Sequence, residues 1–329
     1  MKKIFALLLS AALLVTLLAA CGGSTTTSED QDAQEPAADA STTQTEEQEP
    51  DTGDASKDDP LNQDVIGEKE LLVVSFGTSY NDSRRETIGA IEKAMQTAFP
   101  DYSVRRAFTS QIIIDHVKDR DGVTIDNVTE ALDRAVDNGV KTLVVQPTHL
   151  MNGLEYKELT DELAKYSDSF EQIAVGEPLL TSDADFEAVM TAITDATKDA
   201  ADGKTAICFM GHGTTADSNE VYSKMQTMLT DAGFSDYYVG TVEATPSVED
   251  VLAAVQKGSY EKVVLRPLMI VAGDHANNDM AGDEDDSWKS TFEKAGYTVE
   301  CQVEGLGQLD AVQQLFVAHA QAAVDSLSK

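Results

Sequence analysis

The feature that most limits the fold of this chain is a strand–loop–helix pattern that occurs twice. The first copy reads KELLVVSFGTSYNDSRRETIGAIEKAMQTAF, at 69–99, and the second reads KTAICFMGHGTTADSNEVYSKMQTMLTDAG, at 204–233. In each copy an apolar run typical of a buried strand leads into Gly-Thr-Ser or Gly-Thr-Thr, and a segment with apolar residues at helical spacing follows. Repetition of one supersecondary unit predicts two similar lobes.

A second pair of segments extends the repeat. GVKTLVVQPTHLMNGLEY parallels YEKVVLRPLMIVAGDH, with a proline near the end of each apolar run. When the glycines of GTS and GTT are aligned, Phe76 falls opposite His212. When the two prolines are aligned, Glu155 falls opposite His275. The two halves therefore carry different polar side chains at matching positions.

Strands alternate with helices along the chain after residue 67. In the first half, strands are expected at 70–76, 102–108, 140–147 and 170–176, and helices at 81–99, 110–122, 126–139 (N-cap Asp126) and 153–167. Such alternation predicts an α/β fold with parallel sheets covered by helices on both faces. We expect an N-terminal α/β lobe at 68–200 and a C-terminal α/β lobe at 203–329, with an active-site cleft between them.

Several polar residues stand at or just past the carboxyl ends of expected strands. His212 follows TAICFMG, Glu155 lies in THLMNGLEY, and His275 lies in VAGDHANND. In open α/β sheets the binding crevice lies beyond the carboxyl ends of the strands. We therefore expect these three side chains to face the cleft.

The two histidines are candidate metal ligands. Glycines flank His212, so its imidazole can stand clear of neighbouring side chains and bind a metal or accept a proton. Carboxylates crowd His275, and a carboxylate beside a metal-binding histidine orients its ring. For each residue an alternative stays open, because a histidine can also hydrogen-bond a tight turn or lie in a solvated loop.

Glu243 in VGTVEATPS is the candidate third ligand, because it ends a strand-like run in the same half as both histidines. Two imidazoles and one carboxylate leave an open coordination position where a metal can be exchanged. The alternative for Glu243 and for Glu155 is an acid that interacts with the dipole of a helix N-terminus. His149 also ends a strand, and a supporting or structural role is favoured for it. The remaining histidines, at 116 and 319, lie in expected helices and are interpreted as structural or surface residues.

The N-terminus reads MKKIFALLLSAALLVTLLAAC, which has the charged start, short apolar run and small residues of a secretory signal. Its last four residues resemble the bacterial lipobox, which implies that residues 1–21 are a lipoprotein signal peptide and that Cys21 carries the lipid. The protein is then exported and anchored to the outer face of the cell membrane. Residues 22–67 contain 13 acids and one lysine, and almost no large apolar residues, so we expect a disordered acidic spacer.

The rest of the chain, 68–329, contains 45 acids and 21 Lys or Arg residues. This excess of negative charge argues against nucleic acid as a partner. Cys208 and Cys301 lie in apparent strands and are expected to be buried free thiols, with a disulfide between them as the alternative. The motifs GxSxG, GxxxxGK[ST] and HExxH do not occur in the sequence.

Long blocks of the sequence resemble a known family. VSFGTSYNDSRRETIGAIE, RRAFTSQIII, VVQPTHLMNGLEY, FMGHGTTAD, VGTVEATPSVEDVL, PLMIVAGDHANNDMAGDEDDSWK and FVAH together resemble the anaerobic-type sirohydrochlorin cobaltochelatases, from about Leu71 to about Ala322. These are class II chelatases related in fold to ferrochelatase. The resemblance implies two Rossmann-like lobes and insertion of a divalent metal into a tetrapyrrole without a nucleotide.

Carried over by position, the resemblance implies that His212, Glu243 and His275 bind the metal. It also implies that Glu155 is a further active-site residue, and we expect His212 to receive a pyrrole proton. The substrate metal that the resemblance implies is Co²⁺, with Fe²⁺ or Ni²⁺ as further candidates. Sirohydrochlorin carries many carboxylates, so the protein needs positive side chains to bind them. The candidates are Arg84, Arg85, Arg105 and Arg106. The alternative for each is a solvated arginine on the surface.

Two hypotheses follow from these observations. The first is a membrane-anchored enzyme that inserts Co²⁺ into sirohydrochlorin, and the intact set of ligand positions favours it. The second is an exported lipoprotein that binds a metal, haem or a tetrapyrrole for uptake and keeps the chelatase fold, and the N-terminal signal favours it. The oligomeric state is open, with a homo-oligomer as one possibility.

Overall fold

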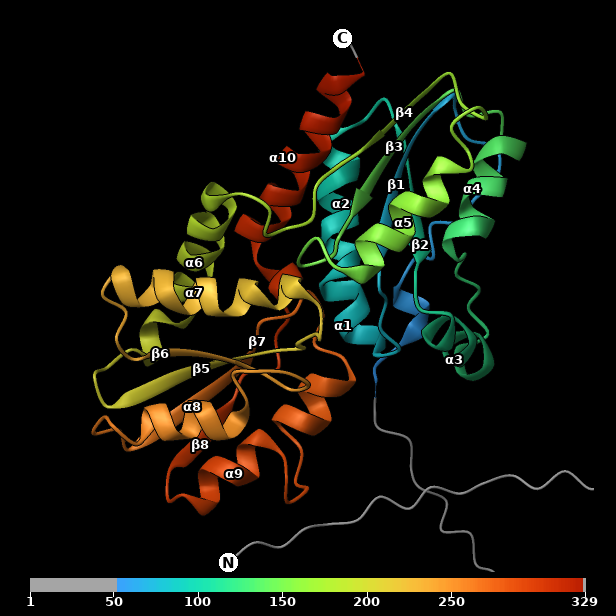
Figure 1. Cartoon of the computed structure of the whole chain (residues 1–329). Helices are drawn as coiled ribbons and strands as arrows, with labels where there is room; N and C mark the ends of the chain where they lie inside the picture. Colours follow the sequence, from blue (N-terminus) through green and yellow to red (C-terminus); the bar gives the residue numbers. More distant parts are fainter. Residues whose placement is uncertain (1–51, 328–329) are drawn as a thin grey trace, which may run out of the picture. The chain divides into compact units, whose positions relative to one another are not determined.

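Two four-stranded parallel sheets organise residues 52–327, the part of the chain that the computed structural model describes (Figure 1). The first sheet has the order β2-β1-β3-β4, with β1 (Lys69–Ser75), β2 (Ser103–Phe108), β3 (Thr142–Pro147) and β4 (Gln172–Val175). The second has the order β6-β5-β7-β8, with β5 (Thr205–Gly211), β6 (Tyr237–Thr241), β7 (Lys262–Pro267) and β8 (Thr298–Cys301). The predicted α/β fold with two similar parallel sheets is confirmed.

The registers of the two sheets confirm the internal repeat. Val74 of β1 lies opposite Pro147 of β3, and Met210 of β5 lies opposite Pro267 of β7. Two residues after each of β1 and β5, a glycine adopts a positive φ, 102° at Gly77 and 91° at Gly213. The turns that leave the two central strands are therefore equivalent, and they carry a phenylalanine in one lobe where the other has a histidine.

The helices that follow the first three strands match the expected pattern with two corrections. They are α1 (Asn81–Glu86), α2 (Ile88–Ala98), α3 (Gln111–Asp121), α4 (Val128–Asp137) and α5 (Leu154–Ala164). The single helix expected at 81–99 is divided at Thr87, whose hydroxyl donates to the carbonyl of Ser83 at 2.5 Å and competes with regular helix geometry. The N-cap of α4 is Asn127, because the carboxylate of Asp126 binds the buried Arg105 and the partly exposed Arg134 instead.

The remaining helices are α6 (Asp183–Thr197), α7 (Glu220–Asp231), α8 (Val248–Val255), α9 (Trp288–Lys294) and α10 (Asp310–Ser326). Two of them depart from the lobe limits expected at 200 and 203. Figure 1 shows α6 beside α7 of the second lobe, whereas α10 returns to the first lobe and packs on α2 and β3. The chain therefore crosses between the lobes twice, before α6 and before α10.

The hydrophobic core has three main layers. One cluster lies between α2, α6, α7, α10 and the facing sides of both sheets, and includes Ile91, Phe209 and Phe316. The other side of the first sheet packs against α4 and α5, and the other side of the second sheet packs against α8 and α9. Each sheet is thus buried on both faces, which accounts for the continuous apolar runs in its central strands.

The acidic spacer expected at 22–67 is wrong for residues 52–67. This segment packs on the first lobe through Leu61, which is 6% exposed, and through the Asp58 carboxylate, which is 4% exposed and paired with buried arginines. The rest of the spacer, the predicted signal peptide and Cys21 lie outside the described residues. Within 52–327, Cys208 and Cys301 are free thiols, as expected, although only Cys208 is fully buried. No helix in this range is long and apolar enough to cross a membrane.

Candidate functional site

A cavity of about 330 Å³ lies at the carboxyl ends of the central strands of both sheets. Its wall is built from the segments that follow β1, β3, β5 and β7, together with parts of α2, α3 and α7. Side chains from both lobes therefore meet here, as the strand-end positions predicted. The residues that line it include Phe76, Thr78, His149, Glu155, His212 and His275.

The loop after β6 places Glu243 next to His212. The amide of Glu243 donates to the carbonyl of His212 at 2.9 Å, and the amide of Val242 donates to the carbonyl of Gly211 at 3.0 Å. Gly213 allows this close approach, because a Cβ at that position would lie 2.9 Å from both N and Cβ of Ala244. The two loops are thus joined by backbone hydrogen bonds that fix the base of both side chains.

His275 directly precedes a one-turn π-helix, Ala276–Met280. Its Nδ1 lies 2.7 Å from Oδ2 of Asp279, and Nδ1 of His212 lies 2.7 Å from the carbonyl oxygen of Gly213. Because each partner atom is an oxygen acceptor, these contacts favour the tautomer with the proton on Nδ1, in which the lone pair of Nε2 is available to a metal. A carboxylate or carbonyl on the far ring nitrogen is the usual support of a metal-binding histidine.

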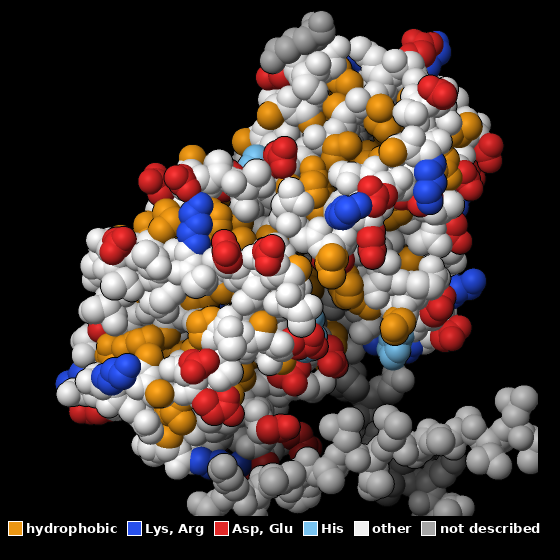
Figure 2. All heavy atoms as spheres, in the orientation of Figure 1, with side chains coloured by type: hydrophobic (Ala, Val, Ile, Leu, Met, Phe, Trp, Pro, Cys, Tyr) orange, Lys and Arg blue, Asp and Glu red, His pale blue; other side chains and the backbone are white. Residues whose placement is uncertain are grey.

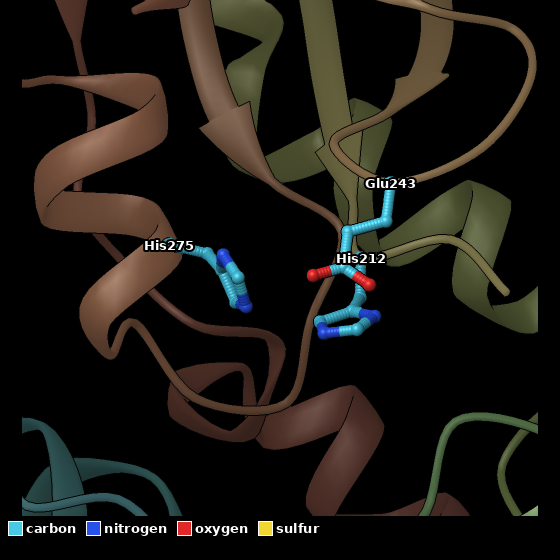
Figure 3. A group of neighbouring side chains, drawn as sticks. All are labelled: His212, Glu243 and His275. Atoms are coloured by element: carbon cyan, nitrogen blue, oxygen red, sulfur yellow. The ribbon is translucent and has the colours of Figure 1, made fainter. Parts of the chain in front are cut away.

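The structure brings His212, Glu243 and His275 together (Figure 3). One ligand atom of each residue lies within 4.8 Å of those of the other two, and the two imidazole centroids are 4.6 Å apart with ring planes at 84°. None of the three is buried, so an ion can enter. Two imidazoles and one carboxylate suit a divalent transition metal and leave coordination positions open for a second ligand. The role of these residues as metal ligands stays a prediction.

Glu155 and His149 belong to the opposite lobe. Glu155 lies in the first turn of α5, and its Oε2 is 3.6 Å from the position that a Cβ on Gly153 would occupy. His149 follows β3 and is 9% exposed. Burial lowers the pKa of His149 to about 4, against an opposing effect of the Glu155 carboxylate, so this imidazole is neutral at neutral pH. The catalytic role of Glu155 stays a prediction.

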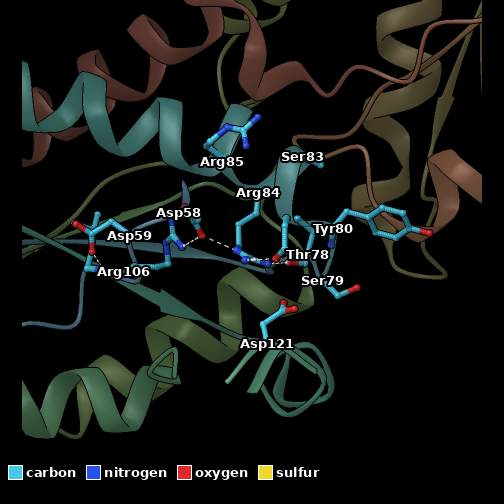
Figure 4. Close-up of polar contacts among 12 residues, drawn as sticks. Asp58, Asp59, Thr78, Ser79, Tyr80, Ser83, Arg84, Arg85, Arg106 and Asp121 are labelled. Carbon is cyan, nitrogen blue, oxygen red and sulfur yellow. Dashed lines mark hydrogen bonds and ion pairs between the residues drawn. The ribbon is translucent and has the colours of Figure 1, made fainter. Parts of the chain in front are cut away.

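The prediction that Arg84 and Arg106 contact the substrate is wrong, because both side chains are buried ion-pair partners (Figure 4). Nε of Arg84 lies 2.6 Å from the Asp58 carboxylate, and Nη1 of Arg106 lies 2.7 Å from the same group. Arg106 also makes two hydrogen bonds of 2.7 Å to Glu92. Both guanidinium groups are therefore paired with acids inside the first lobe and do not reach a substrate in the cavity.

The prediction is also wrong for Arg105, whose side chain is fully buried and lies 2.9 Å from Asp126 and 3.6 Å from Glu70. Arg85 is partly exposed, but it pairs with Asp82 and its own neighbour Glu86 and is not among the residues that line the cavity. For Arg84, Arg105 and Arg106 the physical reason is the same: the first lobe contains buried acids that require these cations.

The wall of the cavity is largely apolar, which was not predicted from the sequence. No Lys or Arg occurs among the described residues that line it, and much of it is apolar, from Phe76, Ile113, Leu150, Met151, Leu154, Met269 and Ile270. Figure 2 shows acidic side chains over much of the visible face, in keeping with the net charge of −34. A signal was present in the sequence, because large apolar residues continue past the strand ends in HLMNGL and PLMIV.

Comparisons with known proteins agree with this architecture. The sequence model of the cobalt chelatase (CbiK) family matches residues 69–325. The chain is 37% identical over 257 residues to a sirohydrochlorin cobaltochelatase of Salmonella typhimurium, covering 78% of this chain and 97% of that protein. It is 29% identical to the sirohydrochlorin cobaltochelatase CbiKC of Nitratidesulfovibrio vulgaris, covering 79% and 92%.

Among solved structures, SirB from Bacillus subtilis with Fe³⁺ resembles the fold. It has a TM-score of 0.57 at 13% identity and covers 80% of this chain and 98% of SirB. This likeness concerns the fold alone, whereas the sequence match spans most of the described residues and contains the three clustered ligand candidates. The chain belongs to the cobalt chelatase (CbiK) family.

Proposed function

We propose that this protein inserts Co²⁺ into sirohydrochlorin without a nucleotide. The observation that carries the proposal is the convergence of His212, Glu243 and His275 at the wall of a largely apolar cavity. Family membership supports it, because the relatives in Salmonella and Nitratidesulfovibrio are both named sirohydrochlorin cobaltochelatases. Co²⁺ is here a substrate, which the protein must bind and then release into the ring.

The ligand set fits a transient metal. Two neutral imidazoles and one carboxylate replace part of the water shell of Co²⁺ and leave positions where the pyrrole nitrogens can attack. His212 and Glu243 are held by joined loops and His275 by Asp279, so the three donors need little reorganisation before the ion arrives. None of the three side chains is buried, so the ion can pass from them to a ring that lies against them.

Metal insertion also releases two protons, because the free-base ring exchanges two inner N–H protons for one dication. As the ion moves into the ring, Nε2 of His212 loses its metal and becomes available to accept one proton. Glu155, on the opposite lobe, is the group we assign to the second. General bases of this kind contribute about 10²–10⁴-fold in rate.

The test is metal insertion by the purified protein, followed through the absorbance of sirohydrochlorin after addition of Co²⁺. His212→Ala and His275→Ala should each lower the rate at limiting Co²⁺ by about 100-fold or more, because loss of a residue that only supports a ligand already costs 10–100-fold. His116→Ala is the matched control, since His116 lies on α3 and does not line the cavity. Rates of both site variants within twofold of an active wild type would refute the assignment of these histidines as metal ligands. If the wild type and both variants insert the metal only at the uncatalysed rate while still binding the tetrapyrrole, the insertion activity itself is refuted and the protein is a tetrapyrrole carrier.

We further propose that the protein is exported and held at the outer face of the membrane by a lipid on Cys21. Support comes from the sequence alone: the lipobox-like end of the first 21 residues, and a family match that begins only at residue 69. Cys21→Ser should move the protein from the membrane fraction to the soluble fraction and abolish incorporation of labelled fatty acid. Unchanged membrane association in this variant would contradict the proposal.

A further inference from the structure

His149 is a buried imidazole without a hydrogen-bond partner. It is 9% exposed, and neither Nδ1 nor Nε2 has a partner among the described residues. His319, whose side chain is 14% exposed, uses both ring nitrogens, in contacts with Asp185 and with the carbonyl oxygen of Glu177. A buried polar atom left unpaired costs free energy, so an unpaired imidazole in a folded protein requires an explanation.

The backbone around His149 is fixed on both sides. The amide of Thr148 donates to the carbonyl of Val74 at 2.8 Å, and the carbonyl of His149 itself accepts from the amide of Leu179 at 3.0 Å. The next carbonyl, of Leu150, accepts from the amide of Leu180 at 2.8 Å. The backbone of the loop is therefore fixed, and His149 lies in the cavity wall. Both ring nitrogens are buried, so a rotation of the side chain has to bring one of them to a ligand in the cavity.

The surroundings restrict what this imidazole can bind. Its low pKa, about 4, results from burial and keeps it neutral at neutral pH. The nearest charge that acts on it is the carboxylate of Glu155, which repels a second carboxylate. A substrate carboxylate is therefore a poor partner here, whereas an uncharged N–H donor meets a free lone pair without opposing charge.

We propose that His149 accepts a hydrogen bond from an inner N–H group of the bound free-base tetrapyrrole, and that this contact makes the site prefer substrate over metallated product. The inference rests on the proposed function, since it takes sirohydrochlorin as the ligand of the cavity. His149 lies on the first lobe, and the cluster of His212, Glu243 and His275 lies on the second. A ring between the lobes then meets the metal from one side and the imidazole from the other.

The contact exists only before the reaction. The free-base ring has inner N–H groups, and insertion of the dication removes those protons, so the product has no donor to offer His149. The imidazole then returns to its unpaired state, which weakens the hold on the product. Its role is positioning and discrimination, because the proton itself leaves through other groups.

The experiment compares the Kd of the full-length protein for free-base sirohydrochlorin and for cobalt-sirohydrochlorin, both without free metal, by absorbance titration. We expect His149→Leu to raise the Kd of the free base by about tenfold and to leave the Kd of the product within twofold, because the ring loses one hydrogen bond that only the free base makes. His149→Gln, which keeps an acceptor, should recover part of the preference. His116→Leu is the matched control on an exposed histidine.

Two further measurements test whether His149 is instead a metal ligand or a residue needed for stability. Co²⁺ binding without tetrapyrrole should be unchanged in His149→Leu, and a weaker affinity would identify His149 as a metal ligand and overturn the proposal. Thermal unfolding should show no loss of stability, because leucine has a similar volume and removes unpaired polar atoms. A destabilised or unfolded variant, or an equal change in both Kd values, would also overturn it. Failure of the proposed function shows itself separately, as absence of metal insertion by the wild type.

Discussion

The strongest structural prediction concerns Asp58, which lies in the segment that sequence composition assigned to a disordered spacer. Its carboxylate is 4% exposed and accepts hydrogen bonds from Nε of Arg84 at 2.6 Å and from Nη1 and Nη2 of Arg106 at 2.7 and 3.0 Å. Glu92 supplies the second acid of this cluster. Two buried cations and two buried anions therefore balance, and Asp58→Asn leaves one buried positive charge uncompensated.

The magnitude follows from that imbalance. Removal of one partner from a buried ion pair destabilises a protein by about 3–5 kcal/mol, because the remaining charge stays desolvated. Asparagine keeps the shape and one acceptor oxygen, so Asp58→Asn should fall near the lower end, about 3 kcal/mol. With a urea m-value of about 3 kcal/mol/M for a chain of this size, the midpoint of unfolding should fall by about 1 M.

The assay is urea denaturation at neutral pH, followed by circular dichroism. Asp64→Asn is the matched control, because it makes the same change in the same segment at an exposed pair: Asp64 is 67% exposed and Arg134 is 30% exposed. Exposed pairs contribute about 0–1 kcal/mol. If Asp58→Asn changes the free energy of unfolding no more than Asp64→Asn does, the buried cluster does not hold the segment and the reasoning fails.

Three more predictions test single groups. Burial raises the pKa of Glu70 to about 7 from its ordinary value of 4.5, so the folded chain binds this proton more tightly than the unfolded chain, and stability is lost as the pH rises from 4.5 to 7. The difference in unfolding free energy between Glu70→Gln and the wild type should therefore grow by about 3 kcal/mol over that pH window, at 1.36 kcal/mol for each pKa unit. Urea titrations at several pH values measure this difference. A difference that does not change with pH would contradict the raised pKa of Glu70. Glu155→Gln should lower single-turnover insertion by about 100-fold at saturating Co²⁺ without changing the affinity for Co²⁺, and a parallel loss of affinity would make Glu155 a ligand instead. Gly213→Ala should cost about 1–3 kcal/mol in thermal unfolding and weaken Co²⁺ binding, since φ is 91° and the new Cβ would meet Ala244 at 2.9 Å; an unchanged melting temperature would show that the turn relaxes.

The repeat explains why much of the fold and the clustering of three site residues were predictable. Parallel strands that alternate with helices place all strand ends of one lobe at one edge of its sheet, so residues directly after strands converge even when they are remote in sequence. His212 and Glu243 follow adjacent strands, β5 and β6, and His275 follows β7 on the other side of β5. Position at strand ends accounts for His212 and Glu243, whereas His275 lies eight residues past the end of β7 and also depends on the loop that carries it.

The arginines show where such reasoning stops. The sequence SVRRAF suggested two exposed cations. Arg105 and Arg106 are neighbours in β2, yet both side chains are buried, on opposite faces of the first sheet. A strand alternates its side chains between faces, and here each face contains an acid from a distant segment: Asp126 for Arg105, and Asp58 with Glu92 for Arg106. The partners lie up to 48 residues away in sequence, so no local pattern indicates the burial.

The same network connects the N-terminal segment to the cavity. Arg84, which binds Asp58 through Nε, also donates from Nη1 to the carbonyl oxygen of Thr78 at 3.1 Å (Figure 4). Thr78 lines the cavity, whereas Asp58 precedes the residue at which the family match begins. A fragment cut at the start of that match would keep every proposed metal ligand but leave Arg84 without its anion. Because a buried guanidinium cannot stay unpaired at low cost, the side chain would turn toward solvent and release the Thr78 loop. Through Arg84, the Thr78 part of the cavity wall is therefore connected to a residue that neither the repeat nor the family match includes.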